Sequence, residues 1–298
     1  MAKPVLKWAG GKRQILHKLR ACISQDYDAY HEPFFGGGAL FFDLEPGNGS
    51  INDINPRLMN FYSILQSEDW RDMVEEAKEL EENHSEEFYY ECRDEFNRLR
   101  NQRGQMRYDE RVKEAALLLY LNRTCFNGLY RENQSGEFNV PIGSYSNPDI
   151  VHPDQLQEAH DALQGIDIMN KDYRYIGHEA EAEDLVYFDP PYQKGSGENF
   201  AEYFSDTFDV DDQIELLHLV LDLHEQGVEV AMSNSGAAER LYKKEDRYQE
   251  YIENEDLFVV PLEARRSINS DGENRTGADE IILTSVPEQK RKESLSSY

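Results

Sequence analysis

Seven short apolar runs, several followed by segments with helical periodicity, most constrain how this chain can fold. Short apolar runs between turn signals are typical of buried strands, and their alternation with helices predicts an α/β fold around a mostly parallel sheet. At 298 residues the chain is long enough for one large domain that carries an insertion. The predicted strands are Tyr30–Glu32, Ser50–Ile54, Ile166–Met169, Leu185–Phe188, Val228–Met232, Leu257–Val260 and Glu280–Thr284.

The strand signals vanish between residues 56 and 151, where helical periodicity replaces them. We therefore predict a helical insertion at 57–150 in an α/β domain formed by 1–56 and 151–286, with a polar tail at 287–298. The insertion ends in a long turn-rich loop, NRTCFNGLYRENQSGEFNVPIGSYSNP, and such loops are usually functional. The predicted helices are Asp69–Glu82, Ser85–Arg103 and Glu110–Leu121.

The chain is strongly acidic, with 59 acidic residues against 31 basic ones and a formal net charge of −28. Such an excess suggests adaptation to a salt-rich cytoplasm, where salt screens the repulsion between like charges. Residues 93–131 are locally positive, with nine arginines and lysines against five acids. One surface can therefore still face a phosphate backbone, although high salt weakens the electrostatic part of such binding.

The spacing of the cysteines and the hydropathy of the chain indicate the cellular compartment in which we expect the protein. The three cysteines, Cys22, Cys92 and Cys125, are widely spaced without a CxxC pair, so we expect reduced residues rather than a metal site or disulfides. The first residues lack the apolar run of a signal peptide, and no stretch approaches the length of a membrane span. We expect a cytoplasmic protein that needs neither a membrane nor a metal.

Two glycine-rich turns predict a nucleoside-cofactor site. The run HEPFFGGGALFFD, starting at His31, fits a strand end, a tight turn and a helix start, where glycine lets the backbone approach a ligand. Asp53 follows the next apolar run, the place where doubly wound sheets hold ribose hydroxyls. The second turn, KWAGGKRQIL, carries Trp8 and Lys12 and is closely followed in sequence by the first, which favours a lip over the cofactor with Lys12 near its charged end. A core Trp8 with a solvated Lys12 is the structural alternative.

The stretch YFDPPY, residues 187–192, predicts a corner rich in hydrogen-bond acceptors. Asp189 follows an apolar strand, and the prolines after it fix φ and lack N–H donors, so their carbonyls remain acceptors. The Asp189 carboxylate and the Pro190 carbonyl can accept both hydrogens of a purine amino group, which aims the nitrogen lone pair at an electrophile. Tyr192 can stack on a base that has left its helix. A plain Pro-Pro turn ending a strand is the structural alternative.

Together these segments resemble the Dam-type DNA adenine-N6 methyltransferases, the D12 class in the alpha arrangement. The resemblance covers nearly the whole chain, from KWAGGK through EPFFGGG, NDIN, the long loop and DPPY to RRSINSDGENRTGADEIIL. It implies a Rossmann-like doubly wound sheet with an antiparallel last strand, an inserted target-recognition domain and S-adenosylmethionine as cofactor. The residues it implies for the cofactor are Trp8, Lys12, Phe34, Gly36, Gly38, Asp53, Asp172 and Asp189.

The same resemblance implies double-stranded DNA as the partner and GATC as the target sequence. Arginine and lysine can bind guanine O6 and N7, and Leu129 offers an apolar contact for a thymine methyl group. Phe126 stands where some relatives have tyrosine and can fill the gap left by a flipped base. The RRS segment, residues 265–267, can approach cofactor or DNA, or be a plain hairpin. The residues implied for DNA binding are Lys7, Phe126, Asn127, Leu129, Arg131 and Tyr145.

Several alternatives remain open. A similar fold can methylate cytosine N4, an RNA adenine or a protein glutamine, although Asp189 before the prolines favours adenine and the long insertion favours DNA. A catalytically idle DNA-binding module would lack the intact cofactor glycines, and a dinucleotide oxidoreductase would carry GxGxxG. The sequence leaves open whether such an enzyme is solitary, restriction-linked or phage-borne, and a monomer is compatible with it.

Overall fold

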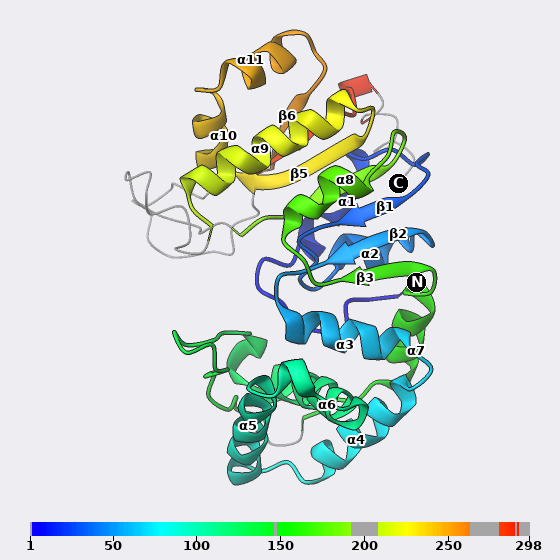
Figure 1. Cartoon of the computed structure of the whole chain (residues 1–298), viewed down its shortest axis with the longest axis vertical. Helices are drawn as coiled ribbons and strands as arrows, with labels where there is room; N and C mark the ends of the chain where they lie inside the picture. The colour runs from blue at the N-terminus through cyan, green and yellow to red at the C-terminus, as the bar shows by residue number, and fades with distance from the viewer. Residues whose placement is uncertain (1, 146–147, 192–207, 263–279, 290, 292–298) are drawn as a thin grey trace. The chain divides into compact units, whose positions relative to one another are not determined.

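The computed structural model describes residues 2–145, 148–191, 208–262, 280–289 and 291 (Figure 1). The chain divides into two compact units. Unit 1 comprises Met1–Arg13 and Phe35–Lys171, and unit 2 comprises Gln14–Phe34 and Asp172–Tyr298. The helices of the predicted insertion therefore share a compact unit with the glycine turn at Gly36 and with the strands that precede and follow them.

A seven-stranded sheet runs in the order β3-β2-β1-β4-β5-β7-β6. The pairs β2/β3, β1/β4 and β4/β5 are parallel, whereas β7 is antiparallel to both β5 and β6. The prediction of a mostly parallel, Rossmann-like sheet with an antiparallel last strand is confirmed. The strands are β1 Tyr30–Glu32, β2 Gly49–Asn52, β3 Ile166–Met169, β4 Leu185–Phe188, β5 Glu229–Ser235, β6 Phe258–Leu262 and β7 Glu280–Thr284.

Three of the seven strands differ from prediction at their ends. β6 runs from Phe258 to Leu262 rather than from Leu257 to Val260, and the ends of β2 and β5 shift for identifiable reasons. β2 ends at Asn52 rather than at Ile54, because the Asp53 carboxylate accepts the backbone N–H of Asn55 at 2.8 Å and turns the chain. Ile54 is consequently 71% exposed. β5 continues to Ser235, because its ladder with β7 extends to the pair Ser235 and Glu280.

Eleven α-helices occupy the part of the chain that the structure describes, and four short 3-10 turns accompany them. The three helices predicted inside the insertion are present as α4, α5 and α6 with small shifts at their ends. The helices are α1 Leu16–Ala21, α2 Ala39–Leu44, α3 Pro56–Gln66, α4 Trp70–Glu82, α5 Glu86–Arg100, α6 Tyr108–Thr124, α7 Pro153–Ala162, α8 Ile176–Glu179, α9 Val210–Glu225, α10 Gly236–Tyr242 and α11 Asp246–Glu253.

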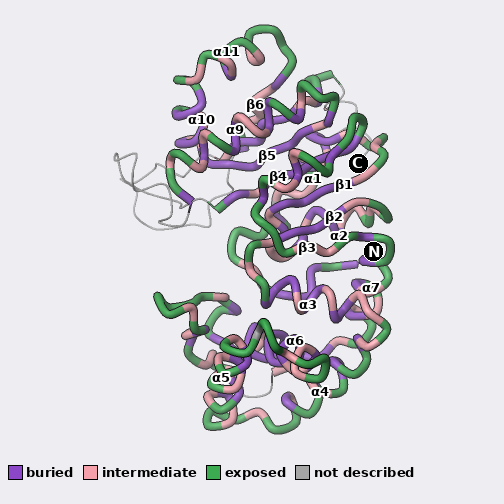
Figure 2. The backbone as a smooth tube through the Cα atoms, viewed as in Figure 1, coloured by how far each residue is buried: buried purple, intermediate pink, exposed green. Residues whose placement is uncertain are grey.

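In unit 1, α6 is the central helix of a bundle with α3, α4 and α5 (Figure 1). Its middle turns, from Glu114 to Asn122, are buried at every position, as its colour in Figure 2 shows. A helix buried on all sides is apolar all round, which is why the amphipathic period is weak here. The buried Arg57 of α3 lies 3.7 Å from the Glu114 carboxylate and stacks on the Phe96 ring.

In unit 2, the core forms between α9 and the strands β4 and β5. Leu216, Leu217 and Val220 of α9 pack with Phe188 and Met232 in one buried cluster. The amphipathic spacing of these α9 residues is the pattern that buries one helix face on a sheet. The Asp209 side chain caps α9 by accepting the N–H groups of its first turn.

None of the described helices is long and apolar enough to cross a membrane. Within the described ranges, no group of three or more histidine, cysteine or acidic side chains is placed to hold a metal ion. The predicted stacking residue Tyr192 and the segment 265–267 lie outside the described residues.

Candidate functional site

The glycine turn in unit 1 packs tightly against its surroundings. Gly36 and Gly38 both have positive φ, at +51° and +63°, the region that favours glycine. A Cβ on Gly38 would lie 2.3 Å from the Phe35 ring, and one on Gly36 would lie 2.8 Å from the Trp8 indole. The turn therefore requires glycine for both backbone conformation and space, as expected of a loop that brings backbone close to a ligand.

Asp53 holds this turn in place. Its carboxylate accepts the N–H of Gly36 at 3.0 Å and that of Asn55 at 2.8 Å. Burial raises the pKa of Asp53, and the two backbone donors act in the opposite direction. The Asn170 side chain donates to the Asp53 carbonyl at 2.7 Å, so the ends of the parallel strands β2 and β3 are tied together.

Trp8 packs against the turn, and its role as a lip over the cofactor stays a prediction. The indole packs against Gly36 and the Trp8 Cβ against Gly37, and the indole stacks with Tyr130 at a centroid distance of 5.0 Å and an angle of 24°. Lys12 is only 6% exposed, and its Nζ donates to the Gly10 carbonyl at 3.3 Å. Lys12 is therefore buried rather than solvated, in contrast to the structural alternative.

In unit 2, the DPPY corner follows β4 directly. Asp189 is half-buried and Pro190 is buried. Gln213 of α9, fully buried, donates to the Pro191 carbonyl at 3.4 Å. Its own side-chain oxygen accepts from the Asn234 amide at 2.8 Å and from the hydroxyl of Tyr242 at 3.0 Å. The corner thus rests on a buried polar network that fixes backbone acceptors.

Phe34 follows β1 in the same unit. Its ring stacks on Tyr173 at 5.1 Å and meets the Phe208 ring edge-on at 5.7 Å. The Tyr173 hydroxyl is buried, and burial raises its pKa to about 12. Phe34 therefore belongs to an aromatic cluster beside the DPPY strand, and any contact with a cofactor remains a prediction.

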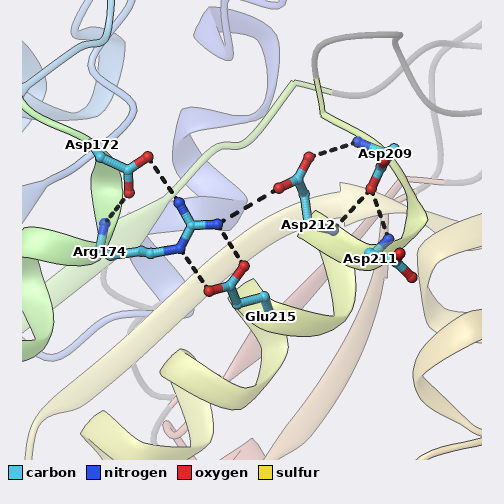
Figure 3. A network of polar contacts seen from close by, with 6 residues as sticks. All are labelled: Asp172, Arg174, Asp209, Asp211, Asp212 and Glu215. Carbon is cyan, nitrogen blue, oxygen red and sulfur yellow. Dashed lines mark hydrogen bonds and ion pairs between the residues drawn. The ribbon is translucent and has the colours of Figure 1, made fainter.

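Asp172 is held by an exposed network of polar contacts that Figure 3 shows. Its carboxylate accepts from the Arg174 backbone N–H at 3.0 Å and from the Arg174 guanidinium at 2.9 Å. Arg174 also donates to Glu215 at 2.7 Å and lies 3.7 Å from Asp212, both on α9. This guanidinium lowers the pKa of Glu215. Arg174 thus joins Asp172 to α9 and orients the carboxylate predicted to lie beside the cofactor adenine.

The predicted DNA-binding residues Lys7 and Tyr145 meet in unit 1. The Lys7 Nζ donates to the Tyr145 hydroxyl at 3.4 Å and lies 5.4 Å from the ring centroid. The Lys7 backbone exchanges two hydrogen bonds with the Asn122 side chain, each of 2.8 Å. A Cβ on Gly128 would lie 2.3 Å from the Lys7 side chain, so only glycine at this position leaves room for the lysine.

The loop after α6 presents two apolar side chains to solvent. Phe126 is 50% exposed and Leu129 is 40% exposed, and they are two of the four large hydrophobic residues exposed in the described part of the chain. Asn127 between them has a φ of +56° and an exposed side chain. The Phe126 N–H donates to the Pro141 carbonyl at 2.9 Å. This hydrogen bond holds the loop backbone while the side chains of Phe126 and Leu129 remain exposed.

Arg131 begins a short hairpin that returns at Asn139. The two are joined by a backbone hydrogen bond of 3.2 Å and by one of 2.8 Å from the Arg131 Nε to the Asn139 side chain. Asn97 of α5 anchors the returning strand through Phe138 at 2.8 and 3.0 Å. The structure therefore brings all six predicted DNA-binding residues into one compact unit, on the N-terminal segment and on the long loop that follows α6.

Several of the arginines and lysines counted in residues 93–131 are engaged in ion pairs or hydrogen bonds within the chain. Arg98 and Lys113 both bind Glu95, and their contacts lower the pKa of that carboxyl to about 2. Arg107 pairs with Asp109, and Arg123 donates to the Val5 carbonyl. The segment is therefore not one basic face, and base contacts must supply more of any affinity for DNA.

The three cysteines are buried and unpaired by disulfides, as predicted. Burial raises the pKa of Cys22 and of Cys125 to about 11, and that of Cys92 to about 12. Thiols with such high pKa values are poor nucleophiles, so covalent cysteine chemistry has no support here.

Three residues that the sequence analysis did not single out contribute to this arrangement. Asn122 forms two hydrogen bonds with the Lys7 backbone, Tyr130 stacks on Trp8, and Gln213 donates a hydrogen bond to the Pro191 carbonyl. Tyr130 carried the one available signal, because it stands between two predicted contact residues. The other two are buried helix residues whose partners are distant in sequence.

Comparison with known proteins agrees with this arrangement. Residues 8–259 match the family model described as D12 class N6 adenine-specific DNA methyltransferase. The chain is 36% identical over 291 residues to the Type II methyltransferase M1.LlaDCHI of Lactococcus lactis subsp. cremoris, with 95% of each chain covered.

Two further relatives match over nearly their whole length. Identity is 35% over 298 residues to the Type II methyltransferase M.MjaIII of Methanocaldococcus jannaschii, covering 94% of this chain and 98% of the relative. It is 32% over 287 residues to the DNA adenine methylase of Escherichia coli K12, with 95% of each chain covered. The family model and the relatives show, and the fold agrees, that this chain belongs to the D12 class N6 adenine-specific DNA methyltransferases.

Proposed function

We propose that this enzyme transfers a methyl group from S-adenosylmethionine to N6 of an adenine flipped out of duplex DNA, within the sequence GATC. The observation that carries the proposal is the loop after α6, residues 125–131, which we call the recognition loop. In it Phe126 and Leu129 are exposed beside Lys7 and Arg131. Exposed apolar side chains next to cations suit base edges better than they suit the phosphate backbone alone.

The cofactor turn fits the donor that the family implies. Gly36 and Gly38 leave no room for a side chain, and Asp53 is held at the end of β2 with acceptor capacity beyond its two backbone bonds. Ile54, 71% exposed next to Asp53, offers an apolar face for an adenine ring. When bound, S-adenosylmethionine supplies an electrophilic methyl group, and Trp8 and Lys12 would close over it.

The DPPY corner would orient the target amino group. An exocyclic amino group conjugated with a purine ring is a weak nucleophile with two N–H donors. The Asp189 carboxylate and the Pro190 carbonyl would accept both hydrogens, which frees the nitrogen lone pair for in-line attack. Most of the rate then comes from proximity and orientation. Tyr192 is proposed to stack on the flipped ring.

The recognition loop supports GATC as the target. Lys7 and Arg131 can each bind a guanine through O6 and N7, and Leu129 can contact the thymine methyl group. Phe126, half-exposed at the tip of its turn, can occupy the space that the flipped adenine leaves. Asn127 and Tyr145 complete the proposed contact surface.

Replacing Arg131 with alanine should cost ~1–3 kcal/mol at one base pair and relax specificity there. The physical reason is the loss of a bidentate contact, because Asn139 holds the Arg131 Nε and thereby orients the guanidinium. The measurement is kcat/KM on duplexes substituted at each target position. Arg107→Ala is the control, since this exposed arginine pairs with Asp109. A uniform loss on every duplex would reassign Arg131 to phosphate contact.

The overall proposal is tested by incubating the enzyme with labelled S-adenosylmethionine and duplex DNA from low to molar salt. N6-methyladenine should be the product, and activity should peak at high salt if the net charge of −28 reflects a saline cytoplasm. Label in cytosine, RNA or protein instead would overturn adenine in DNA as the target. An optimum at low salt would overturn the saline interpretation alone.

A further inference from the structure

Tyr130 occupies an unexpected position in the recognition loop. Its neighbours Leu129 and Arg131 are both exposed, whereas the Tyr130 side chain turns inward and is half-buried. The ring stacks on Trp8 with centroids 5.0 Å apart and planes 24° from parallel. It also packs against the buried Phe138 ring at 5.6 Å, which belongs to the returning strand of the Arg131 hairpin. One side chain therefore touches both the hairpin and the lip.

Trp8 continues the contact to the cofactor turn. A Cβ on Gly36 would lie 2.8 Å from the indole Cδ1, and one on Gly37 would lie 3.1 Å from the Trp8 Cβ. The indole is thus in contact with the turn backbone and has little room to move toward it. A displacement of the Tyr130 ring must be accommodated by Trp8, and a displacement of Trp8 must be accommodated by the turn, because packed groups resist continuous deformation.

The Tyr130 hydroxyl adds polar contacts to a ring that Trp8 and Phe138 already hold by packing. It donates to the Glu132 carboxylate and interacts with the side chain of Asn55. Asn55 is the N-cap residue of α3, and its N–H is bound by Asp53. The tyrosine is therefore tied at its rim to the same corner that fixes the Gly36 N–H.

We infer that Tyr130 is a positioning residue that couples base reading by Leu129 and Arg131 to cofactor binding, through its stack on Trp8. The inference rests on the proposed function, since it takes the turn as the cofactor site and the loop as the DNA reader. When the target sequence fixes the loop, the Tyr130 ring fixes Trp8 over the turn. Linkage then requires each ligand to tighten the binding of the other by the same factor.

The test measures the affinity for S-adenosylhomocysteine, which cannot react, by calorimetry with and without a duplex that the wild-type enzyme methylates. The ratio of the two affinities is the coupling factor, and couplings between sites are typically ~5–150-fold. The wild-type factor should lie in that range. Tyr130→Leu should bring it close to one, and Tyr130→Phe, which keeps the ring, should retain it within about twofold of the wild-type value.

Tyr108→Leu is the matched control, because this tyrosine is 47% exposed on α6 and lies outside the site. A wild-type factor of one, or an unchanged factor in Tyr130→Leu, would overturn the inference. Equal loss in the leucine and phenylalanine variants would also overturn the stacked ring as the route. A merely structural role would lower the melting temperature of Tyr130→Leu without changing the factor. Failure of the proposed function is recognised separately, as a wild-type enzyme that methylates no duplex.

Discussion

Replacing Asp189 with alanine is expected to bring methyl transfer below detection, a loss of at least ~10²–10³-fold in kcat. The carboxylate stands immediately after the buried strand β4, where the prolines keep the neighbouring backbone free of donors. Without it, the target amino group keeps a hydrogen that no acceptor orients, and its lone pair remains conjugated with the ring. Single-turnover rates at saturating cofactor and DNA measure this loss apart from any weaker binding.

The matched control for this variant is Asp167→Ala, which removes an exposed carboxylate from the middle of β3. That enzyme should keep its rate within about twofold. Asp189→Asn should fall between the two extremes, because the amide keeps one acceptor oxygen. Turnover by Asp189→Ala at the rate of the control would remove Asp189 from the mechanism.

Replacing Gly38 with alanine should have the second largest effect. The added Cβ would lie 2.3 Å from the ring of Phe35, which is buried and meets the Tyr62 ring edge-on at 4.7 Å. Overpacking of this kind typically costs ~1–3 kcal/mol. The positive φ of +63° adds strain of ~1–2 kcal/mol for any residue with a Cβ. We expect a lower free energy of unfolding and a raised KM for S-adenosylmethionine, because Phe35 and the turn must move apart.

Gly47→Ala separates these two contributions. Gly47 has a similar φ of +71°, but a Cβ there meets nothing within 4 Å. This variant should show the backbone strain alone and an unchanged KM. Equal destabilisation of the two variants in urea unfolding, with KM unchanged in both, would show that the packing of Phe35 against the turn has no role in the site.

The sheet could be predicted from the sequence because its strands are short apolar runs with turn signals at both ends. β1, β3, β4 and β7 have the predicted boundaries. The end of β2 could not be predicted, because the Asp53 side chain takes a backbone N–H that the strand pattern does not reveal. Long-range pairing likewise decided the end of β5, which its partner β7 extends by three residues beyond Met232.

The candidate site was predictable where a motif carries the chemistry and unpredictable where packing does. Gly36 and Asp53 stand in recognisable turns, and the structure joins them by a hydrogen bond. Gln213 could not be found in this way, because an amide in an amphipathic helix gives no sign of the Pro191 carbonyl that it supports. The burial of Lys12 was also hidden, since a lysine beside glycines is usually solvated.

Methyl transfer to two duplexes of identical composition, one containing GATC and one with the four bases permuted, measures base reading directly. We expect N6-methyladenine in the GATC duplex and a kcat/KM on the permuted duplex lower by at least ~10³-fold, the discrimination expected of specific readout. Equal methylation of both duplexes would contradict the assignment of Leu129 and Arg131 as base readers.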